Sequence, residues 1–330
     1  MKHVSIMVPV GTAIVDTIIG SLNLFQMANN HRKRALGFEE DLFAIDLVGL
    51  TRDPITFNRF FSVAPTKALQ EVEETDLIIV AGIVGDIEKQ IERNYAFVDW
   101  MRHQRIGHGA EIASLCRGAF LLAETGLLNG KSCATHWITH DKFQQKYPEV
   151  QLIPEKVINE DNGIYSSGGA YSFLNLLLHL IEKFYGRETA IWCSKMAEIE
   201  FDRMDQNQFV IFNGQKEHSD DAIKEVQDYV ELHYSDRLSV EALADRAAIS
   251  NRNFVRRFKK ATNNTPLEYI QRVRIESAKK KLESTTMNVL QVMLASGYND
   301  DKTFRTIFKK YTGLTPLEYR KKYNREMALG

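Results

Sequence analysis

Two stretches of the sequence carry residue types whose spacing suits chemistry at a cysteine. In "SLCRGAFLLAETG", Cys116 stands between a short apolar run and the start of an expected helix, with Gly118 two residues on. A nucleophile elbow has this shape, because a tight turn exposes the side chain while the helix start favours a thiolate. Twenty residues later "CATHW" supplies His136, the candidate partner of Cys116. The alternative interpretation is a buried, unreactive cysteine and a surface histidine.

A metal site is a weaker interpretation of the same region. His140 lies close to His136 in sequence, but no third ligand follows at a convincing spacing. We therefore expect His140 to be solvent-exposed, and we expect neither a metal ion nor a cofactor.

The C-terminal third contains one segment twice. "FKKATNNTPLEY" (258–269) recurs as "FKKYTGLTPLEY" (308–319), and each copy ends a short helix that follows another helix and a turn. Two helix-turn-helix units in tandem are therefore expected. At about 100° per residue, the second helix of each unit turns two phenylalanines inward and a basic, polar face outward. The outward residues are Arg252, Val255, Arg256 and Lys259 in the first unit and Lys302, Arg305, Thr306 and Lys309 in the second.

These outward faces have the chemistry that the DNA major groove requires. Lys and Arg contact phosphates, and Arg can also bind a guanine edge with two hydrogen bonds. The segment between the units would form a rod of about 27 Å as a helix, while successive major-groove faces lie about 34 Å apart. One chain could then present two recognition helices to adjacent grooves. The alternative, an ordinary amphipathic surface helix, does not explain why the same polarity recurs.

The charge of the chain is unevenly distributed. The net charge is -1, but residues 222–330 carry +8 and residues 1–221 carry -9, so a basic module follows an acidic one. The length and the 44% hydrophobic content are those of a soluble globular protein with two domains. Three cysteines fit a reduced compartment, and the apolar opening is too short to span a membrane. We expect a cytoplasmic protein without a membrane partner.

The basic module resembles a known family. Residues from about 222 to 325, through "LADRAAISNRNFVRRFKKATNNTPLEYI" and "VMLASGYNDDKTFRTIFKKYTGLTPLEYR", resemble the DNA-binding domain of the AraC/XylS family of bacterial transcription regulators. The resemblance implies that Arg252, Val255, Arg256, Lys302 and Thr306 face bases. Asp300 and Asp301 are unusual beside phosphate, and we interpret them as capping the helix N-terminus, with base selection as a further role.

The acidic half alternates short apolar runs with amphipathic segments. Strands are expected at 3–10, 43–50, 76–82, 111–115 and 163–169, and helices at 18–32, 88–104, 118–128, 140–147 and 172–186. Such alternation predicts an α/β domain with a mostly parallel sheet covered on both faces. Ligands of these sheets bind beyond the carboxyl ends of the strands.

This half also resembles a family. "VDTIIGSLNLFQMAN", "ASLCRGAFLLAETGLLNGKSCATHW" and "SSGGAYSFLNLLLHLIEKFYGRETA" are similar to the PfpI-like branch of the class I glutamine amidotransferase superfamily. The resemblance implies a flavodoxin-like sheet with an elbow cysteine at Cys116, its histidine at His136 and an acidic neighbour at Asp16. A helix N-cap is the alternative role of Asp16. Gly82 is followed by Ile83 where the family often has two glycines, which puts the oxyanion hole in doubt.

The two halves together predict a regulator. We expect a PfpI-like sensing domain at 1–205, a linker at 206–221, and an all-α tandem helix-turn-helix domain at 222–330. The function predicted is sequence-specific binding of promoter DNA, with a first domain that senses a small-molecule effector or forms a homodimer; RNA polymerase is a further candidate partner. The alternatives are a DNA-tethered thiol enzyme that uses Cys116 and His136, and a redox sensor based on Cys116.

Overall fold

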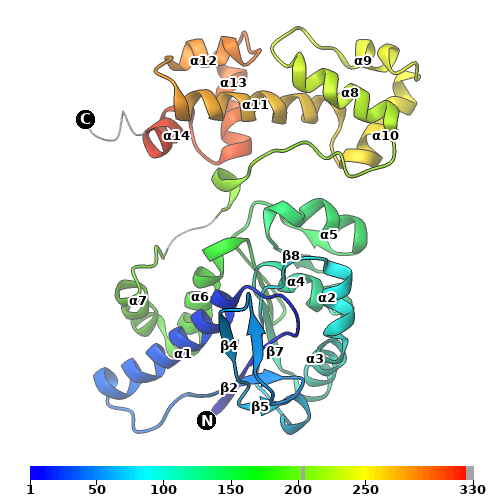
Figure 1. Cartoon of the computed structure of the whole chain (residues 1–330). Coiled ribbons are helices and arrows are strands. Elements are labelled where there is room, and N and C mark those ends of the chain that lie inside the picture. The colour runs from blue at the N-terminus through cyan, green and yellow to red at the C-terminus, as the bar shows by residue number, and fades with distance from the viewer. Residues whose placement is uncertain (202–204, 325–330) are drawn as a thin grey trace. The chain divides into compact units, whose positions relative to one another are not determined.

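The computed structural model describes residues 1–201 and 205–324 and divides the chain into two compact units, Met1–Gln206 and Asn207–Gly330. Each unit has its own hydrophobic cores. The first unit is an α/β sheet structure and the second is helical (Figure 1). Among the described helices, none is both long and apolar enough to cross a bilayer.

The first unit is built on a seven-stranded sheet with the order β10-β11-β7-β6-β1-β2-β5. Its strands are parallel apart from the antiparallel pair β10–β11. The sheet strands are β1 (Lys2–Met7), β2 (Phe43–Gly49), β5 (Lys67–Ala68), β6 (Leu77–Val80), β7 (Glu111–Ser114), β10 (Ile158–Asp161) and β11 (Ile164–Ser167). Its helices are α1 (Val15–Leu36), α2 (Ile87–Arg93), α3 (Tyr95–His108), α4 (Ala119–Glu124), α5 (His140–Lys146), α6 (Phe173–Tyr185) and α7 (Arg187–Met196).

Both faces of the sheet are buried, as the strand sequences require. In β6, Leu77 and Ile79 join one core with residues of α1, α6 and α7, whereas Ile78 and Val80 join a second core with α2, α3 and α4. Figure 1 shows these two groups of helices on opposite sides of the sheet. Because successive side chains of a strand point to opposite faces, a run of apolar residues is what a doubly covered parallel strand needs. The expected flavodoxin-like α/β fold is confirmed.

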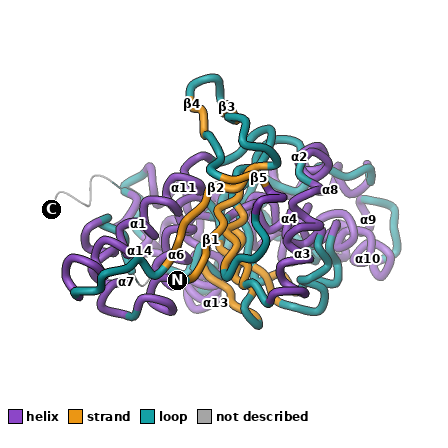
Figure 2. The backbone as a smooth tube through the Cα atoms, turned by 90° about the horizontal axis from the view of Figure 1, so that it is seen from below, coloured by secondary structure: helices purple, strands orange, loops and turns teal. Residues whose placement is uncertain are grey.

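Two small β-structures lie outside this sheet. The antiparallel hairpin β3 (Ile55–Phe57) and β4 (Phe61–Val63) projects away from the sheet edge (Figure 2). A parallel pair joins β8 (Ser132–Cys133) to β9 (Gln151–Leu152). Neither was expected from the sequence, because strands of two or three residues leave too short a pattern to detect.

The second unit contains seven α-helices within its described residues, besides a short 3-10 helix at Asn207–Phe209. They are α8 (Asp221–Leu232), α9 (Val240–Arg246), α10 (Asn251–Thr262), α11 (Pro266–Ser284), α12 (Val289–Ala295), α13 (Asp301–Thr312) and α14 (Pro316–Tyr323). α8, α9 and α10 cluster around one end of α11, and α12, α13 and α14 around the other (Figure 1). α11 contributes Tyr269 and Val273 to the first core and Ile275 and Leu282 to the second. One helix is therefore shared by both helix-turn-helix units.

The repeated segment builds the same joint twice. Phe258 packs edge-to-face on Tyr269 at 5.3 Å, and Phe308 packs the same way on Tyr319 at 5.5 Å. Each following helix starts with a Thr-x-x-Glu capping box, at Thr265 and at Thr315. The capping box satisfies backbone N–H groups at the helix start, while the aromatic pair fixes the angle between the two helices. The recurrence of the sequence is thus a recurrence of one packing unit.

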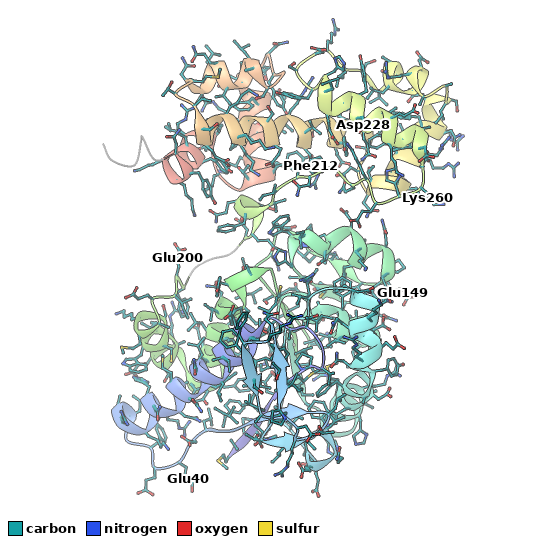
Figure 3. All side chains as sticks on the ribbon, viewed as in Figure 1. Glu40, Glu149, Glu200, Phe212, Asp228 and Lys260 are labelled. Atoms are coloured by element: carbon teal, nitrogen blue, oxygen red, sulfur yellow. The ribbon has the colours of Figure 1, made fainter. Side chains whose placement is uncertain are left out.

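The chain between the two units differs from the expected linker at 206–221. Gln206 belongs to the first unit and residues from Asn207 onward to the second. Phe212 packs on the Tyr269 ring at 5.2 Å (Figure 3), and Lys279 Nζ donates a 2.6 Å hydrogen bond to the Val210 carbonyl. The polar composition of this segment suggested a linker, but Phe212, one of its two phenylalanines, packs against the first helical core.

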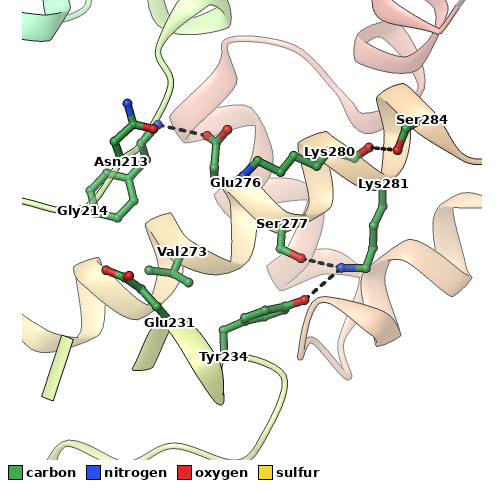
Figure 4. Close-up of a pocket in the computed structure, with 11 residues that line it drawn as sticks. Asn213, Gly214, Glu231, Tyr234, Val273, Glu276, Ser277, Lys280, Lys281 and Ser284 are labelled. Carbon is green, nitrogen blue, oxygen red and sulfur yellow. Dashed lines mark hydrogen bonds between the residues drawn. The ribbon is translucent and has the colours of Figure 1, made fainter. Parts of the chain in front are cut away.

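The same segment helps to enclose a cavity in the second unit. Its volume is about 490 Å³, and α8 and α11 form its other walls (Figure 4). Lys281 Nζ lies between the Tyr234 hydroxyl, at 3.1 Å, and the Ser277 hydroxyl, at 2.5 Å. These contacts tie the chain just after α8 to α11.

Candidate functional site

The cysteine site forms where three parallel strands end at one edge of the sheet. β7 ends at Ser114 and leads into the short turn that starts at Cys116, while β6 ends two residues before Gly82. A Cβ atom added to Gly82 would lie 3.5 Å from Cys116 Cβ. The Cys116 N–H donates a 3.1 Å hydrogen bond to Ser167 Oγ, at the end of β11. The structure thus brings Cys116 and Gly82 together at the edge where such sheets bind ligands.

The backbone at Cys116 has the strained conformation of an elbow. Its φ angle is +54°, in the left-handed region that non-glycine residues rarely adopt. Ala170 has φ +49°, and its N–H contacts Cys116 Sγ. Such conformations cost about 1–3 kcal/mol each and persist only where the surrounding structure enforces them. The two strained residues therefore hold each other in place around the sulfur.

The cysteine is a buried thiol in this arrangement. Cys116 is fully buried, and this burial raises the pKa of its thiol despite the opposing effect of the Ala170 and Arg117 N–H groups. Thiols rather than thiolates then predominate at neutral pH. The elbow pattern of the sequence predicted an exposed side chain, whereas Cys116 is buried here.

His136 lies beside the same turn and is uncharged. Burial, with the positive charges of Arg117 and His140, lowers the pKa of His136 to about 4. Its Nδ1 accepts a 3.1 Å hydrogen bond from the Ile138 N–H, so the neutral ring carries its proton on Nε2. In this tautomer His136 is a hydrogen-bond donor at Nε2 and has no free nitrogen for a cysteine proton.

Two backbone N–H groups beside the sulfur are already hydrogen-bonded within the protein. The Gly82 N–H donates a 3.0 Å hydrogen bond to Thr17 Oγ1, and the Cys116 N–H is used by Ser167. Both are backbone donors that could otherwise stabilise an oxyanion beside the sulfur.

Two further predicted residues lie at the margin of this site. Asp16 is exposed in the first turn of α1, where its Oδ2 receives a long, 3.5 Å hydrogen bond from Tyr171. The N-cap of α1 is Ile14, so the alternative role of Asp16 as a cap is wrong. His140 is half-buried rather than solvent-exposed, with Nε2 at 3.1 Å from the Thr135 carbonyl oxygen. Within the described ranges no group of three metal-ligating side chains is found.

The candidate DNA surface lies on the second helix of each helix-turn-helix unit. In α10 the rings of Phe254 and Phe258 are fully buried, and in α13 those of Phe304 and Phe308. The predicted outward side chains are exposed, apart from a half-buried Val255: Arg252, Arg256, Lys259, Lys302, Arg305, Thr306 and Lys309. Lys260 also lies on the outside of α10 (Figure 3), although the sequence reasoning did not include it.

Two acidic residues organise the start of α13. Asp300 caps the helix by accepting a 2.7 Å hydrogen bond from the Thr303 N–H, as expected. Hydrogen bonding from the Thr303 side chain, and then from its N–H, lowers the pKa of the Asp300 carboxyl. Asp301 instead binds Arg305 Nε, with both carboxylate oxygens within 2.9 Å. At the start of α10, Ser250 occupies the N-cap position but its side chain makes no capping hydrogen bond. The second unit therefore has the better-fixed helix start.

Comparison with known proteins agrees with both units. Residues 34–183 match the family model of the DJ-1/PfpI family, and residues 243–322 match that of a helix-turn-helix domain. The HTH-type transcriptional regulator CdhR of Pseudomonas aeruginosa is 28% identical over 81% of this chain and 78% of its own length. Isonitrile hydratase of Pseudomonas putida is 28% identical over 42% of this chain and 58% of its own length.

A solved structure shows the same fold for the first unit. A putative transcriptional regulator from Vibrio parahaemolyticus superposes with a TM-score of 0.53 at 26% identity, over 59% of this chain and 98% of its own. The matches cover both units of the chain, and each unit has the architecture that its family requires. The chain thus joins a DJ-1/PfpI domain to an AraC-type helix-turn-helix domain and is a DNA-binding transcriptional regulator.

Proposed function

We propose that the second unit reads promoter DNA with α10 and α13 in adjacent major grooves. The observation that carries this proposal is the single helix α11, whose residues enter both hydrophobic cores and so fix the two recognition helices to one rod. Its 19 residues give a length of about 28 Å, comparable to one turn of B-DNA. Arg252, Val255, Arg256, Lys302 and Thr306 would contact bases, and Lys259, Arg305 and Lys309 phosphates.

Footprinting of the full-length chain on genomic fragments tests this assignment. We expect two protected half-sites about one helical turn apart on one side of the duplex. Protection of a single half-site would contradict it.

The first unit, in this proposal, binds a small molecule at Cys116 and His136 and does not turn it over. The buried thiol, the uncharged His136 and the two occupied backbone donors support binding rather than catalysis. The same burial speaks against Cys116 as a peroxide sensor, because oxidation requires an accessible thiolate.

A ligand screen by tryptophan fluorescence can test the effector site. All three tryptophans, Trp100, Trp137 and Trp192, belong to the first unit, so their melting transition reports that unit alone. A ligand at 100 times its Kd adds about 2.7 kcal/mol to stability. A compound that raises the wild-type Tm should lose its effect in Cys116→Ser or His136→Gln. An unchanged shift in both variants would place the effector elsewhere in the first unit.

The proposal also includes a cytoplasmic homodimer, joined through the first unit, that acts with RNA polymerase at the promoter. All three cysteines are free thiols, which fits a reducing compartment. Sedimentation of the full chain with and without operator DNA measures the stoichiometry.

A further inference from the structure

A ring of hydrogen bonds joins the cysteine site to the last residue of the first unit. Thr135 Oγ1 donates to the Cys116 carbonyl at 3.0 Å, and Gln206 Nε2 donates to the Thr135 carbonyl at 3.1 Å. The Gly169 N–H donates to Gln206 Oε1 at 3.1 Å, and the next N–H, that of Ala170, contacts Cys116 Sγ. The ring therefore starts and ends at Cys116 and passes through Gln206.

Gln206 is held unusually firmly for a residue at the edge of a unit. Gln206 is 1% exposed. Its side-chain amide also donates to the carbonyls of Pro154, at 2.9 Å, and Lys156, at 3.3 Å. Its backbone N–H donates to the Glu155 carbonyl at 2.8 Å. Buried side-chain amides need their hydrogen-bond partners, so displacement of any partner loop weakens the anchor.

Two adjacent glycines lie between Gln206 and the cysteine site. A Cβ atom on Gly168 would approach Gln206 Oε1 to 2.9 Å, and one on Gly169 would approach His136 Cδ2 to 2.4 Å. Gly169 has φ -81° and ψ 170°, which any residue can adopt. These positions are therefore glycine because of close approach and not because of backbone conformation. Because both approaches are close, we expect a displacement of His136 to move Gly168 and Gly169 against Gln206.

We propose that Gln206 is the positioning residue through which the Cys116–His136 site acts on the chain leading to the DNA-binding unit. The inference rests on the proposed effector function of that site. A ligand that moves His136 or the 168–170 loop breaks the bonds to Gln206, and this releases the segment that begins at Asn207, the first residue of the second unit. An effector signal thereby becomes a change in how the second unit is tethered.

Hydrogen exchange of the full-length chain tests the coupling without a known effector. Gly169→Ala pushes on His136, Gly168→Ala pushes on Gln206, and Gln206→Leu removes the side-chain bonds. Each should raise amide exchange at residues 205–210 by about tenfold or more, while β1 and β6 stay protected. Gly107→Ala is the matched control, because its new Cβ would meet His103 at an ordinary 3.7 Å. If Gly169→Ala does not fold, His136→Phe replaces it.

The double variant Gly169→Ala/Gln206→Leu decides the matter. Coupling through Gln206 predicts that residues 205–210 exchange no faster in the double variant than in Gln206→Leu alone. The reason is that Gln206→Leu has already removed the side-chain hydrogen bonds to the loop. Multiplied effects, or no change at 205–210 in Gly169→Ala, would overturn the inference. The melting shift by a screened ligand is independent of this cycle, so its loss or survival in Cys116→Ser judges the effector site separately.

Discussion

At the scale of single residues, the geometry of the cysteine site supports the proposal that it binds a ligand and does not react. An elbow with left-handed φ angles is kept at Cys116, yet the sulfur is buried and the neighbouring histidine is neutral. In a thiol enzyme the histidine nitrogen must be free to take the proton of the cysteine. Here Nδ1 of His136 is used by the Ile138 N–H. The elbow geometry is thus present while the proton acceptor is not available.

The uncharged His136 predicts a pH dependence of stability. Its pKa is about 4 in the folded unit, against 6.5 for an ordinary histidine in an unfolded chain, so between these values the unfolded chain binds the extra proton. Stability of the first unit should therefore fall as pH drops from 6.5 toward 4, by roughly 1–2 kcal/mol because the ring is only partly buried. Urea unfolding followed by tryptophan fluorescence at pH 7 and pH 5 measures the loss.

His136→Gln should remove most of that pH dependence. His233→Gln, in the second unit, is the control and should leave the fluorescence transition unchanged. An equally steep pH dependence in His136→Gln would mean that another group is responsible.

On the DNA surface, Arg256 and Lys259 should behave differently. Both are exposed on α10, but only Arg can bind a guanine with two hydrogen bonds. Arg256→Ala should cost about 1–3 kcal/mol at the cognate operator and little on random DNA. Lys259→Ala should weaken both by similar factors and reduce the salt slope by about one. Binding titrations on the two duplexes separate the cases, and a uniform loss in Arg256→Ala would make it a phosphate contact.

At the scale of elements, sequence periodicity predicted the long helices but not the points at which a helix is interrupted. α10 and α13 lie within the two helix-turn-helix units expected from the sequence, and each buries two phenylalanines. The expected helix at 88–104 is instead α2 and α3, separated at Asn94. The side chain of this residue binds the backbone of Val10 at both N–H and carbonyl. That contact spans 84 residues, so no local pattern could reveal it.

The same limit applies to the candidate site. Cys116 and His136 could be paired from motif and resemblance, but Gln206 could not. Its partners, among them Thr135, Pro154 and Gly169, come from separate loops that only the folded sheet brings together. A glutamine in a polar stretch carries no sequence signal for such a role. Likewise, the burial that raises the pKa of the Cys116 thiol depends on tertiary packing.

The shared helix α11 leads to a prediction about spacing. One alanine inserted after Arg274, between the two cores, would turn the second helix-turn-helix unit by about 100° relative to the first. Each core would keep its own contacts, since Val273 and Ile275 lie on opposite sides of the insertion. Affinity for the full operator should fall about 100-fold or more, toward that of a single half-site. An alanine inserted after Arg237, in the loop before α9, is the control, and equal affinity in both variants would contradict a rigid connector.

At the scale of the whole molecule, charge is divided between the units as their roles require. The segment 222–330 carries +8 and residues 1–221 carry -9. A basic unit attracts DNA at long range, whereas an acidic one avoids non-specific binding to it. The paired Asp301 and Arg305 show that part of the positive charge is already neutralised before DNA arrives.

This division predicts a steep salt dependence with a specific exception. Each phosphate neutralised by Lys or Arg contributes about -0.9 to the slope of log K against log salt. The phosphate contacts proposed for Lys259 and Lys309, with Arg305 as a third only where its pairing with Asp301 opens, would give a slope of about -2 to -3, measured by fluorescence anisotropy between about 50 and 200 mM salt. Asp301→Asn frees Arg305 for one more phosphate, so it should steepen the slope by about one unit and raise affinity for random DNA. Asp228→Asn, on α8, is the matched control, because it removes an acidic charge away from the recognition helices. A slope change in both variants alike would mean that net charge, and not release of Arg305, governs binding.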